Sequence, residues 1–369
     1  MARRHADGND VNRAVESARL SAMPLPPNAN DVLRTMHRQP DDMRRLLIDG
    51  AKQTRQAVDL LDGAERIILT GVGSSFTAAI AGSWMLREIG FDARAVAVDD
   101  FWLYPANSHF RPTDAVIVIS HFGLRHAVLE TLNQARQAGA TVLSIGSLSA
   151  DHPGSRLILR TVERDTSMIA TASHLAAMMV LAQIALMLGE RMRPSAVSGW
   201  RPALDSLPAV IASLLHRERE ITPIARIAAG RHVYAVAAGP NESIIAEFMI
   251  KARQAGHATV DAFPLELMIH GPIVAADTGD LGIVVRVPGA AAERTAEFAR
   301  VMERIGMQLW VVGLPLPGAW PHITFELPEF PEMLSPLITM IPMQMLAYQI
   351  ALIRQLDPES FSRVLPLLP

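Results

Sequence analysis

The chain has 369 residues, of which 50% are hydrophobic, so it exceeds the size at which one core stops growing and can bury two. Its 34 Lys and Arg residues nearly balance its 37 Asp and Glu residues, and the net charge of −3 argues against nucleic acid as a partner. The absence of cysteine excludes disulfides, thiolate metal ligands and a cysteine nucleophile in this chain.

The first segment, residues 1–27, is polar and ends in the proline-rich run 24–27. It lacks the apolar run of a signal peptide, and no later segment reaches about 18 uninterrupted apolar residues. We therefore predict a mobile leader, no membrane partner and a cytoplasmic location.

Residues 28–190 have the pattern of a first domain. From Asp31 to about Leu61 the apolar residues show helical spacing, and Pro40 divides this stretch. Strands are expected at 66–71, 92–97, 115–120, 141–146 and 157–162, and helices at 74–89, 124–138 and 171–189. Strands that are apolar throughout favour a parallel sheet covered on both faces.

Residues 191–224 contain several prolines and a helical piece at 203–215, and we interpret them as a connecting segment. The second domain, 225–369, repeats the pattern with a strand at 233–238, a turn at 239–243 and a helix at 244–255. Further strands are expected near 257–262, 281–287, 308–313 and 322–326, and helices near 290–305 and 333–355. The predicted fold class is therefore α/β, with two similar doubly wound domains.

Two strands of the first domain are each followed by a short polar turn and a helix. The first turn carries Gly73, Ser74 and Ser75, and the second carries Ser120 and His121. The N-terminus of a helix favours an anion, because its backbone N–H groups and its dipole both point there. The two turns predict a phosphorylated ligand. The alternative for each serine is ordinary helix capping, which needs no ligand.

These stretches resemble the sugar isomerase (SIS) family, specifically the tandem-SIS isomerase portion of glucosamine-6-phosphate synthase and its relatives, the fructosamine-6-phosphate deglycases and amino-sugar deaminases. The similar motifs lie at 36–40, 71–75, 119–123, 270–272 and 342–348. The resemblance implies two SIS domains, each a five-stranded parallel sheet flanked by helices, with a sugar phosphate at the carboxyl ends of the first sheet. It also implies a homodimer with a shared active site, which His270 of a second copy reaches.

The second turn departs from the family pattern Ser-Gln-Ser-Gly-Glu-Thr. The second serine is Phe122 here, and the threonine is Arg125. Arginine can bind phosphate or carboxylate through two parallel hydrogen bonds. The change is therefore consistent with another mode of anion binding, with a loss of phosphate specificity, or with an acidic group other than phosphate.

The catalytic half departs further. Relatives use a glutamate sixteen positions before the histidine of the HGP motif to move a proton between C1 and C2, and this chain has Gln254 there. An amide cannot act as a general base near neutral pH. Synthases also use a lysine near the C-terminus, and residues 357–369 contain none. The synthases' glutamine-hydrolysing domain, with its cysteine nucleophile, is not found in this sequence, so we do not expect glutamine-dependent amination.

The candidate site follows from the motifs and these departures. Predicted catalytic residues are His270 for ring opening, Glu247 or Glu266 for proton transfer, and Lys251 for amine chemistry. Predicted substrate-binding residues are Gly73, Ser74, Ser75, Ser120, His121, Arg125 and Thr171. For each of them a structural role, such as capping, an ion pair or a buried hydrogen bond, is the alternative. We expect no metal and no cofactor, because the carbonyl chemistry is acid–base chemistry.

Three hypotheses for function remain. The first is an enzyme that isomerises, deaminates or deglycates an amino-sugar phosphate. The second is a non-catalytic phosphosugar-binding protein, which Gln254 and the lysine-free tail favour. The third is an enzyme that acts on a sugar conjugated to an acidic group, which Arg125 would bind.

Overall fold

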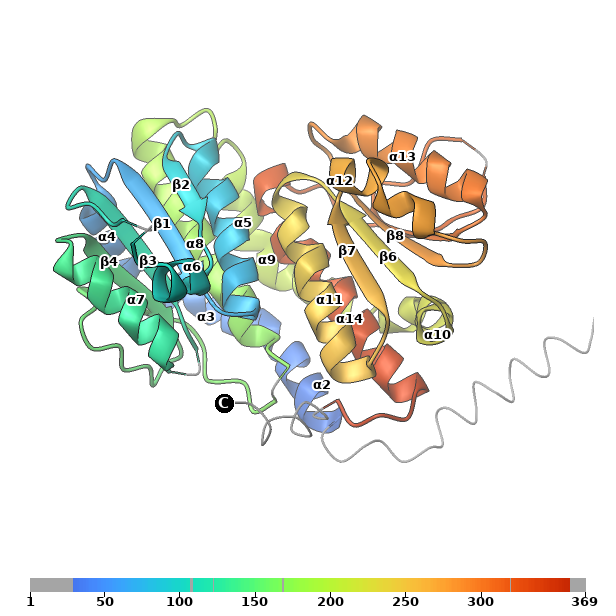
Figure 1. The fold of residues 1–369 in the computed structure, drawn as a ribbon, viewed down its shortest axis with the longest axis horizontal. Helices are drawn as coiled ribbons and strands as arrows, with labels where there is room; N and C mark the ends of the chain where they lie inside the picture. Colours follow the sequence, from blue (N-terminus) through green and yellow to red (C-terminus); the bar gives the residue numbers. More distant parts are fainter. Residues whose placement is uncertain (1–28, 107–108, 122, 168, 319, 359–369) are drawn as a thin grey trace, which may run out of the picture.

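The computed structural model describes residues 29–106, 109–121, 123–167, 169–318 and 320–358. The predicted leader at 1–27 lies outside these residues. In the described part, the chain forms two halves, each built on its own parallel sheet with helices around it (Figure 1).

The first sheet contains five parallel strands in the order β2-β1-β3-β4-β5. These strands are β1 (Arg66–Gly71), β2 (Asp92–Ala95), β3 (Asp114–Ile119), β4 (Thr141–Gly146) and β5 (Leu157–Arg160). From β1 the chain goes to β2 on one side and then crosses to β3 on the other. β1 and β3 pair in register up to Gly71 and Ile119. The segments that follow these two strands therefore leave the sheet side by side, at the position where open α/β sheets bind ligands.

The second sheet repeats this topology, in the order β10-β9-β8-β6-β7. Its strands are β6 (Val233–Ala237), β7 (Val260–Pro264), β8 (Leu281–Arg286), β9 (Gln308–Gly313) and β10 (Ile323–Phe325). The prediction of two five-stranded parallel sheets flanked by helices is confirmed.

The helices of the first half are α2 (Ala29–His37), α3 (Gln39–Asp49), α4 (Ala51–Leu61), α5 (Ser74–Glu88), α6 (Val98–Leu103), α7 (His126–Gln137) and α8 (Ala172–Met192). The stretch expected as a helix divided at Pro40 has a second break. Pro40 lies in the first turn of α3, where its missing N–H costs nothing. The second break is at Gly50, where a Cβ would lie 2.4 Å from the Leu46 carbonyl oxygen.

The helices that follow are α9 (Trp200–Leu215), α10 (Thr222–Gly230), α11 (Glu242–Gly256), α12 (Leu265–Ile269), α13 (Ala292–Ile305) and α14 (Pro336–Ile353). Single 3₁₀ turns are η1 (Glu218–Ile221), η2 (Gly239–Asn241), η3 (Pro272–Ala275) and η4 (Glu332–Leu334). The segment predicted as a connection is thus mainly helical. Its helix α9 packs against both α3 and α14 and joins the two halves.

Helices α5, α8, α11 and α14 meet between the two sheets (Figure 1). Their apolar side chains belong to one continuous core that extends into both halves. Helix α8 and the segment Glu332–Ile353 are long and apolar enough to cross a membrane, but 94% and 89% of their most apolar windows are buried inside the fold. Burial of this extent is typical of helices in a protein core.

A reciprocal pair of side-chain amides lies within this apolar core. The side-chain amides of Gln39 on α3 and Gln344 on α14 bond to each other twice, with N···O distances of 2.9 and 2.8 Å. Both residues are buried. Each amide satisfies the other inside the core, so the pair links α14 to α3.

Candidate functional site

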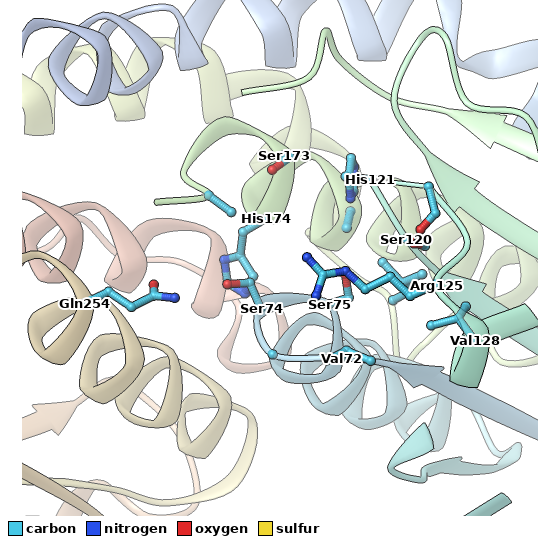
Figure 2. Close-up of a pocket in the computed structure, with 15 residues that line it drawn as sticks. Val72, Ser74, Ser75, Ser120, His121, Arg125, Val128, Ser173, His174 and Gln254 are labelled. Carbon is cyan, nitrogen blue, oxygen red and sulfur yellow. Dashed lines mark hydrogen bonds between the residues drawn. The ribbon is translucent and has the colours of Figure 1, made fainter. Parts of the chain in front are cut away.

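A pocket opens at the carboxyl edge of the first sheet, between the first turn (residues 72–75) and the second turn (residues 120–125) (Figure 2). Residues from the start of α8 and from α11 complete its wall. The residues that line it are Val72, Gly73, Ser74, Ser75, Ile119, Ser120, His121, Gly123, Arg125, Val128, Ala170, Ser173, His174, Ala177 and Gln254. The structure therefore brings six of the seven predicted binding residues together.

The first turn places two serines at the N-terminus of α5. Gly73 precedes the helix with φ 57° and ψ −124°, a conformation that side chains with a Cβ rarely adopt. The chain can therefore turn sharply enough for Ser74 and Ser75 to start the helix at the pocket. The 15 residues of α5 direct their dipole at the same point.

Gly71 lets this turn lie close to the sheet. A Cβ on Gly71 would lie 2.6 Å from the Ser75 Cβ and 3.1 Å from the Ile119 carbonyl oxygen. We expect Gly71→Ala to lower the free energy of unfolding by about 1–3 kcal/mol, because the backbone must shift to accept the methyl group. Urea denaturation measures this change. Gly230→Ala is the matched control, since no atom lies within 4 Å of a Cβ there. Equal stability of the two variants would contradict the prediction.

The second turn carries the cation of the pocket. Arg125 immediately precedes α7, and its exposed guanidinium has no hydrogen-bond or ion-pair partner among the described residues. Ser120 Oγ donates a 2.6 Å hydrogen bond to the Gly123 carbonyl, so this hydroxyl already closes the turn. Phe122, which replaces a serine of the family pattern, lies outside the described residues. The second turn thus offers a free positive charge in place of several hydroxyl donors.

His121 forms the buried end of the second turn. Its Nε2 lies 2.9 Å from Thr161 Oγ1, which in turn donates to the Gly146 carbonyl at 2.8 Å. Since the threonine hydrogen is used in that bond, His121 Nε2 must be the donor, and Nδ1 carries no hydrogen. Burial lowers the pKa of His121 to about 3, so the ring is neutral at physiological pH.

Thr171 lies next to the pocket but does not line it. It is buried, and its hydroxyl donates to Thr35 Oγ1 on α2 at 2.9 Å. Its backbone N–H donates a hydrogen bond to Asp165 Oδ2. The same oxygen accepts a 2.7 Å hydrogen bond from the Ser173 hydroxyl. From this segment the pocket is lined instead by Ala170, Ser173, His174 and Ala177.

Behind the pocket lies a buried cluster formed by Thr77, His174, Glu247 and Lys251. Thr77 Oγ1 lies 2.6 Å from Glu247 Oε2 and 3.1 Å from His174 Nε2. Glu247 and Lys251 are one helical turn apart on α11 and form an ion pair whose side chains are 0% and 1% exposed. Lys251 also donates to the carbonyl of Ala170, a residue of the pocket wall. The cluster connects α11 of the second half to α5 and α8 of the first.

The cluster holds a fixed negative charge at Glu247. Burial alone would raise the pKa of this carboxyl group, but the adjacent ammonium of Lys251 and the hydrogen bonds from Lys251 and Thr77 lower it to about 2. Glu247 is therefore a carboxylate at any physiological pH. Neither Glu247 nor Lys251 lines the pocket; Glu247 is connected to it through Thr77 and His174, and Lys251 through the Ala170 carbonyl.

The other two predicted catalytic residues lie on the surface of the second half. Glu266 is on α12 and His270 follows it, with side chains 55% and 76% exposed. Glu266 accepts a 2.7 Å hydrogen bond from Arg294 Nε, and this bond lowers the pKa of Glu266. Neither residue lines the pocket of its own chain.

Gln254 lines the pocket from α11, so the position where relatives carry a glutamate does face the candidate site (Figure 2). His174 and Thr77 were not predicted. The available signal was weak: His174 is the one titratable residue in the apolar stretch 172–189. In the described part of the chain, no group of three or more His, Cys, Asp or Glu side chains is arranged to hold a metal ion.

Comparison with known proteins gives a family match and several relatives. Residues 60–188 match the SIS domain family. Glutamine–fructose-6-phosphate aminotransferase (isomerizing) of Gloeobacter violaceus is 28% identical over an alignment of 351 positions, which covers 88% of this chain and 56% of that protein. The chain thus spans about half the length of the curated relatives that it matches.

Two solved structures share the fold. The C-terminal domain of glucosamine-fructose-6-phosphate aminotransferase from Francisella tularensis gives a TM-score of 0.80 at 16% identity, covering 92% of this chain and 99% of that one. Tagatose-6-phosphate ketose/aldose isomerase from Escherichia coli gives 0.72 at 18% identity, covering 91% and 98%. The sequence of residues 60–188 is thus similar to the SIS domain family, and the two sheets together share the fold of these solved structures.

Proposed function

We propose that the pocket binds a sugar phosphate, with the phosphate held by the two turns. The observation that carries the proposal is the convergence of Ser74, Ser75 and Arg125 on one pocket at the switch point of the first sheet. A helix N-terminus and an unpaired guanidinium are both suited to an anion. The related proteins named above act, by their names, on fructose 6-phosphate or tagatose 6-phosphate.

We further propose that the protein is an enzyme that isomerises, deaminates or deglycates an amino-sugar phosphate. In this proposal His270 of a second copy opens the sugar ring, which requires a homodimer. The exposure of His270 leaves its imidazole available to another chain. Glu247 is favoured over Glu266 for proton transfer within one chain, because Thr77 and His174 connect it to the pocket. The proposed cytoplasmic location agrees with such a substrate.

A non-catalytic sugar-phosphate-binding protein is the second candidate. Gln254 favours it, because an amide faces the pocket where a base would be needed. The pairing of Glu247 and Lys251 with each other favours it as well, since each has its charge satisfied away from the ligand.

Calorimetry and turnover assays with glucosamine 6-phosphate and fructosamine 6-phosphate test the two candidates. We expect both compounds to bind and at least one to be converted. We also expect Gln254→Glu to raise turnover about 100-fold, because a carboxylate in the pocket can act as a general base. Gln254→Leu is the matched control and gains no base. Binding without turnover in the native chain would favour the non-catalytic candidate, and no binding of any sugar phosphate would refute both.

A further inference from the structure

One buried nitrogen atom of the pocket has no partner among the described residues. It is Nδ1 of His174, a side chain 2% exposed that lines the pocket. In Figure 2 the His174 ring lies on the side of the pocket toward Gln254, and Arg125 and Ser120 lie on the other side. A buried polar atom without a hydrogen bond is costly, and such atoms in folded proteins usually have a specific reason.

The hydrogen bonds of Thr77 determine which nitrogen of His174 carries the hydrogen. The Thr77 hydroxyl has one hydrogen, and its shortest acceptor contact is the 2.6 Å one to the ionised Glu247. Once that hydrogen is given to Glu247, Thr77 Oγ1 can only accept from His174 Nε2, 3.1 Å away. Nε2 of His174 is therefore the donor, and the fixed carboxylate of Glu247 sets this polarity.

The ring is neutral, so Nδ1 is an acceptor. Burial lowers the pKa of His174 to about 4, with the charge of Lys251 acting in the same direction and the charge of Glu247 opposing both. With Nε2–H bonded to Thr77 and no second proton, Nδ1 presents a bare lone pair. A carboxylate or an ionised phosphate oxygen has no hydrogen to give it.

We propose that His174 Nδ1 accepts a hydrogen bond from an O–H or N–H group of the ligand and thereby selects ligands with a hydrogen donor at the end opposite their anionic group. This inference rests on the proposed sugar-phosphate pocket and adds the direction in which the ligand lies in it. The anion lies against Arg125 and the serine turns, and the sugar hydroxyl or amino group faces His174. His174 is a specificity-determining binding residue, and Thr77 and Glu247 are positioning residues that hold its tautomer.

Two amide substitutions separate the two nitrogens of the ring. His174→Gln keeps an N–H donor near the position of Nε2 and removes the Nδ1 acceptor. His174→Asn keeps an acceptor near the position of Nδ1 and removes the bond to Thr77. The ligands are glucosamine 6-phosphate, glucose 6-phosphate and inorganic phosphate, with affinities measured by calorimetry. His216→Gln, on the surface at the end of α9, is the control for the same chemical change.

We expect His174→Gln to weaken both sugar phosphates about five- to tenfold, the value of one hydrogen bond, and to leave inorganic phosphate within about twofold of the native chain. His174→Asn should weaken the binding of the sugar phosphates less than His174→Gln does. A greater loss for glucosamine 6-phosphate assigns the donor to the amino group, and equal losses assign it to a hydroxyl. Equal weakening of inorganic phosphate, or no weakening of either sugar phosphate, would overturn the proposal.

The tautomer provides a test that needs no ligand. Nitrogen NMR of the ligand-free native chain should show His174 with a protonated Nε2 and an unprotonated Nδ1. A hydrogen on Nδ1 would overturn the proposal, even if the sugar phosphates bind. If no sugar phosphate binds the native chain, the proposed function fails, while an unprotonated Nδ1 still supports the acceptor in this pocket.

Discussion

Lys251→Met should lower the free energy of unfolding by about 3–5 kcal/mol, the usual effect of removing one partner from a buried ion pair. The side chains of Lys251 and Glu247 are 1% and 0% exposed, so water cannot replace the lost ammonium. Methionine fills similar space, and the expected loss therefore comes from the carboxylate left without its counter-charge. Urea denaturation followed by circular dichroism measures the change.

Two further variants make this prediction specific. Glu247→Gln combined with Lys251→Met removes both charges, and we expect it to recover most of the lost stability. Arg191→Met breaks an exposed ion pair with Asp59 and should cost at most about 1 kcal/mol. If Lys251→Met unfolds at the same urea concentration as Arg191→Met, the ion pair does not have the assigned role.

The same ion pair predicts how stability depends on pH. The pKa of Glu247 is lowered to about 2 in the fold, so its contribution is complete above the unfolded pKa near 4.3 and is lost as pH falls toward 2. The pKa of His174 is lowered to about 4, so the unfolded chain takes up protons first as pH falls below about 6.5. Both groups therefore lower the free energy of unfolding as the pH falls, His174 below about 6.5 and Glu247 below about 4.3. The Glu247→Gln/Lys251→Met variant should lose the second of these decreases, because it has no carboxylate to protonate.

Arg125→Ala should weaken the binding of a sugar phosphate about 10- to 100-fold, because a charge-assisted hydrogen bond to the anion is removed. Stability should change by less than about 0.5 kcal/mol, since the Arg125 side chain is exposed and unpartnered in the described part of the chain. Calorimetry with glucosamine 6-phosphate measures the affinity. Arg55→Ala, an exposed position on α4, makes the same change in net charge away from the pocket.

Arg125→Thr then distinguishes the kinds of anion. Threonine restores the hydroxyl of the family pattern, so a simple sugar phosphate should bind within about threefold of the native chain. A sugar conjugated to a carboxylate should remain as weak as with Arg125→Ala, because one hydroxyl cannot replace a bidentate guanidinium. If Arg125→Ala binds glucosamine 6-phosphate as tightly as Arg55→Ala does, Arg125 does not hold the anion.

The fold was largely predictable from the sequence. Strands such as 66–71 and 141–146 are short apolar runs between polar turns, and the structure gives them these bounds. The helices α6 and α12, with 6 and 5 residues, were missed, because one turn and a half shows no hydrophobic period. The break at Gly50 was missed for another reason: a single glycine weakens a helix but does not always end it, and the close approach to the Leu46 carbonyl is visible only in the fold.

The candidate site was predictable only for residues that follow a strand closely in the sequence and therefore lie at the sheet edge. Ser74, Ser75, Ser120 and Arg125 directly follow two neighbouring strands, so topology alone brings them together. The residues on long helices depend instead on the direction in which each side chain points. Thr171, just before α8, contacts α2, whereas His174, three positions further along, lines the pocket. The contact of Thr77 with Glu247 depends on how the two halves pack, and no local pattern records it.

The reciprocal bond between Gln39 and Gln344 also has a consequence for synthesis in the cell. The two residues are 305 positions apart. At roughly 5–20 residues per second, a ribosome needs about 15 to 60 seconds to reach the second amide after making the first. During this interval Gln39 lacks its amide partner, and the apolar surface that α14 covers on α8 and α9 stays exposed while the first sheet forms with its neighbouring helices. Completion of the core therefore waits for α14, so a nascent chain remains prone to aggregate until this helix has been made.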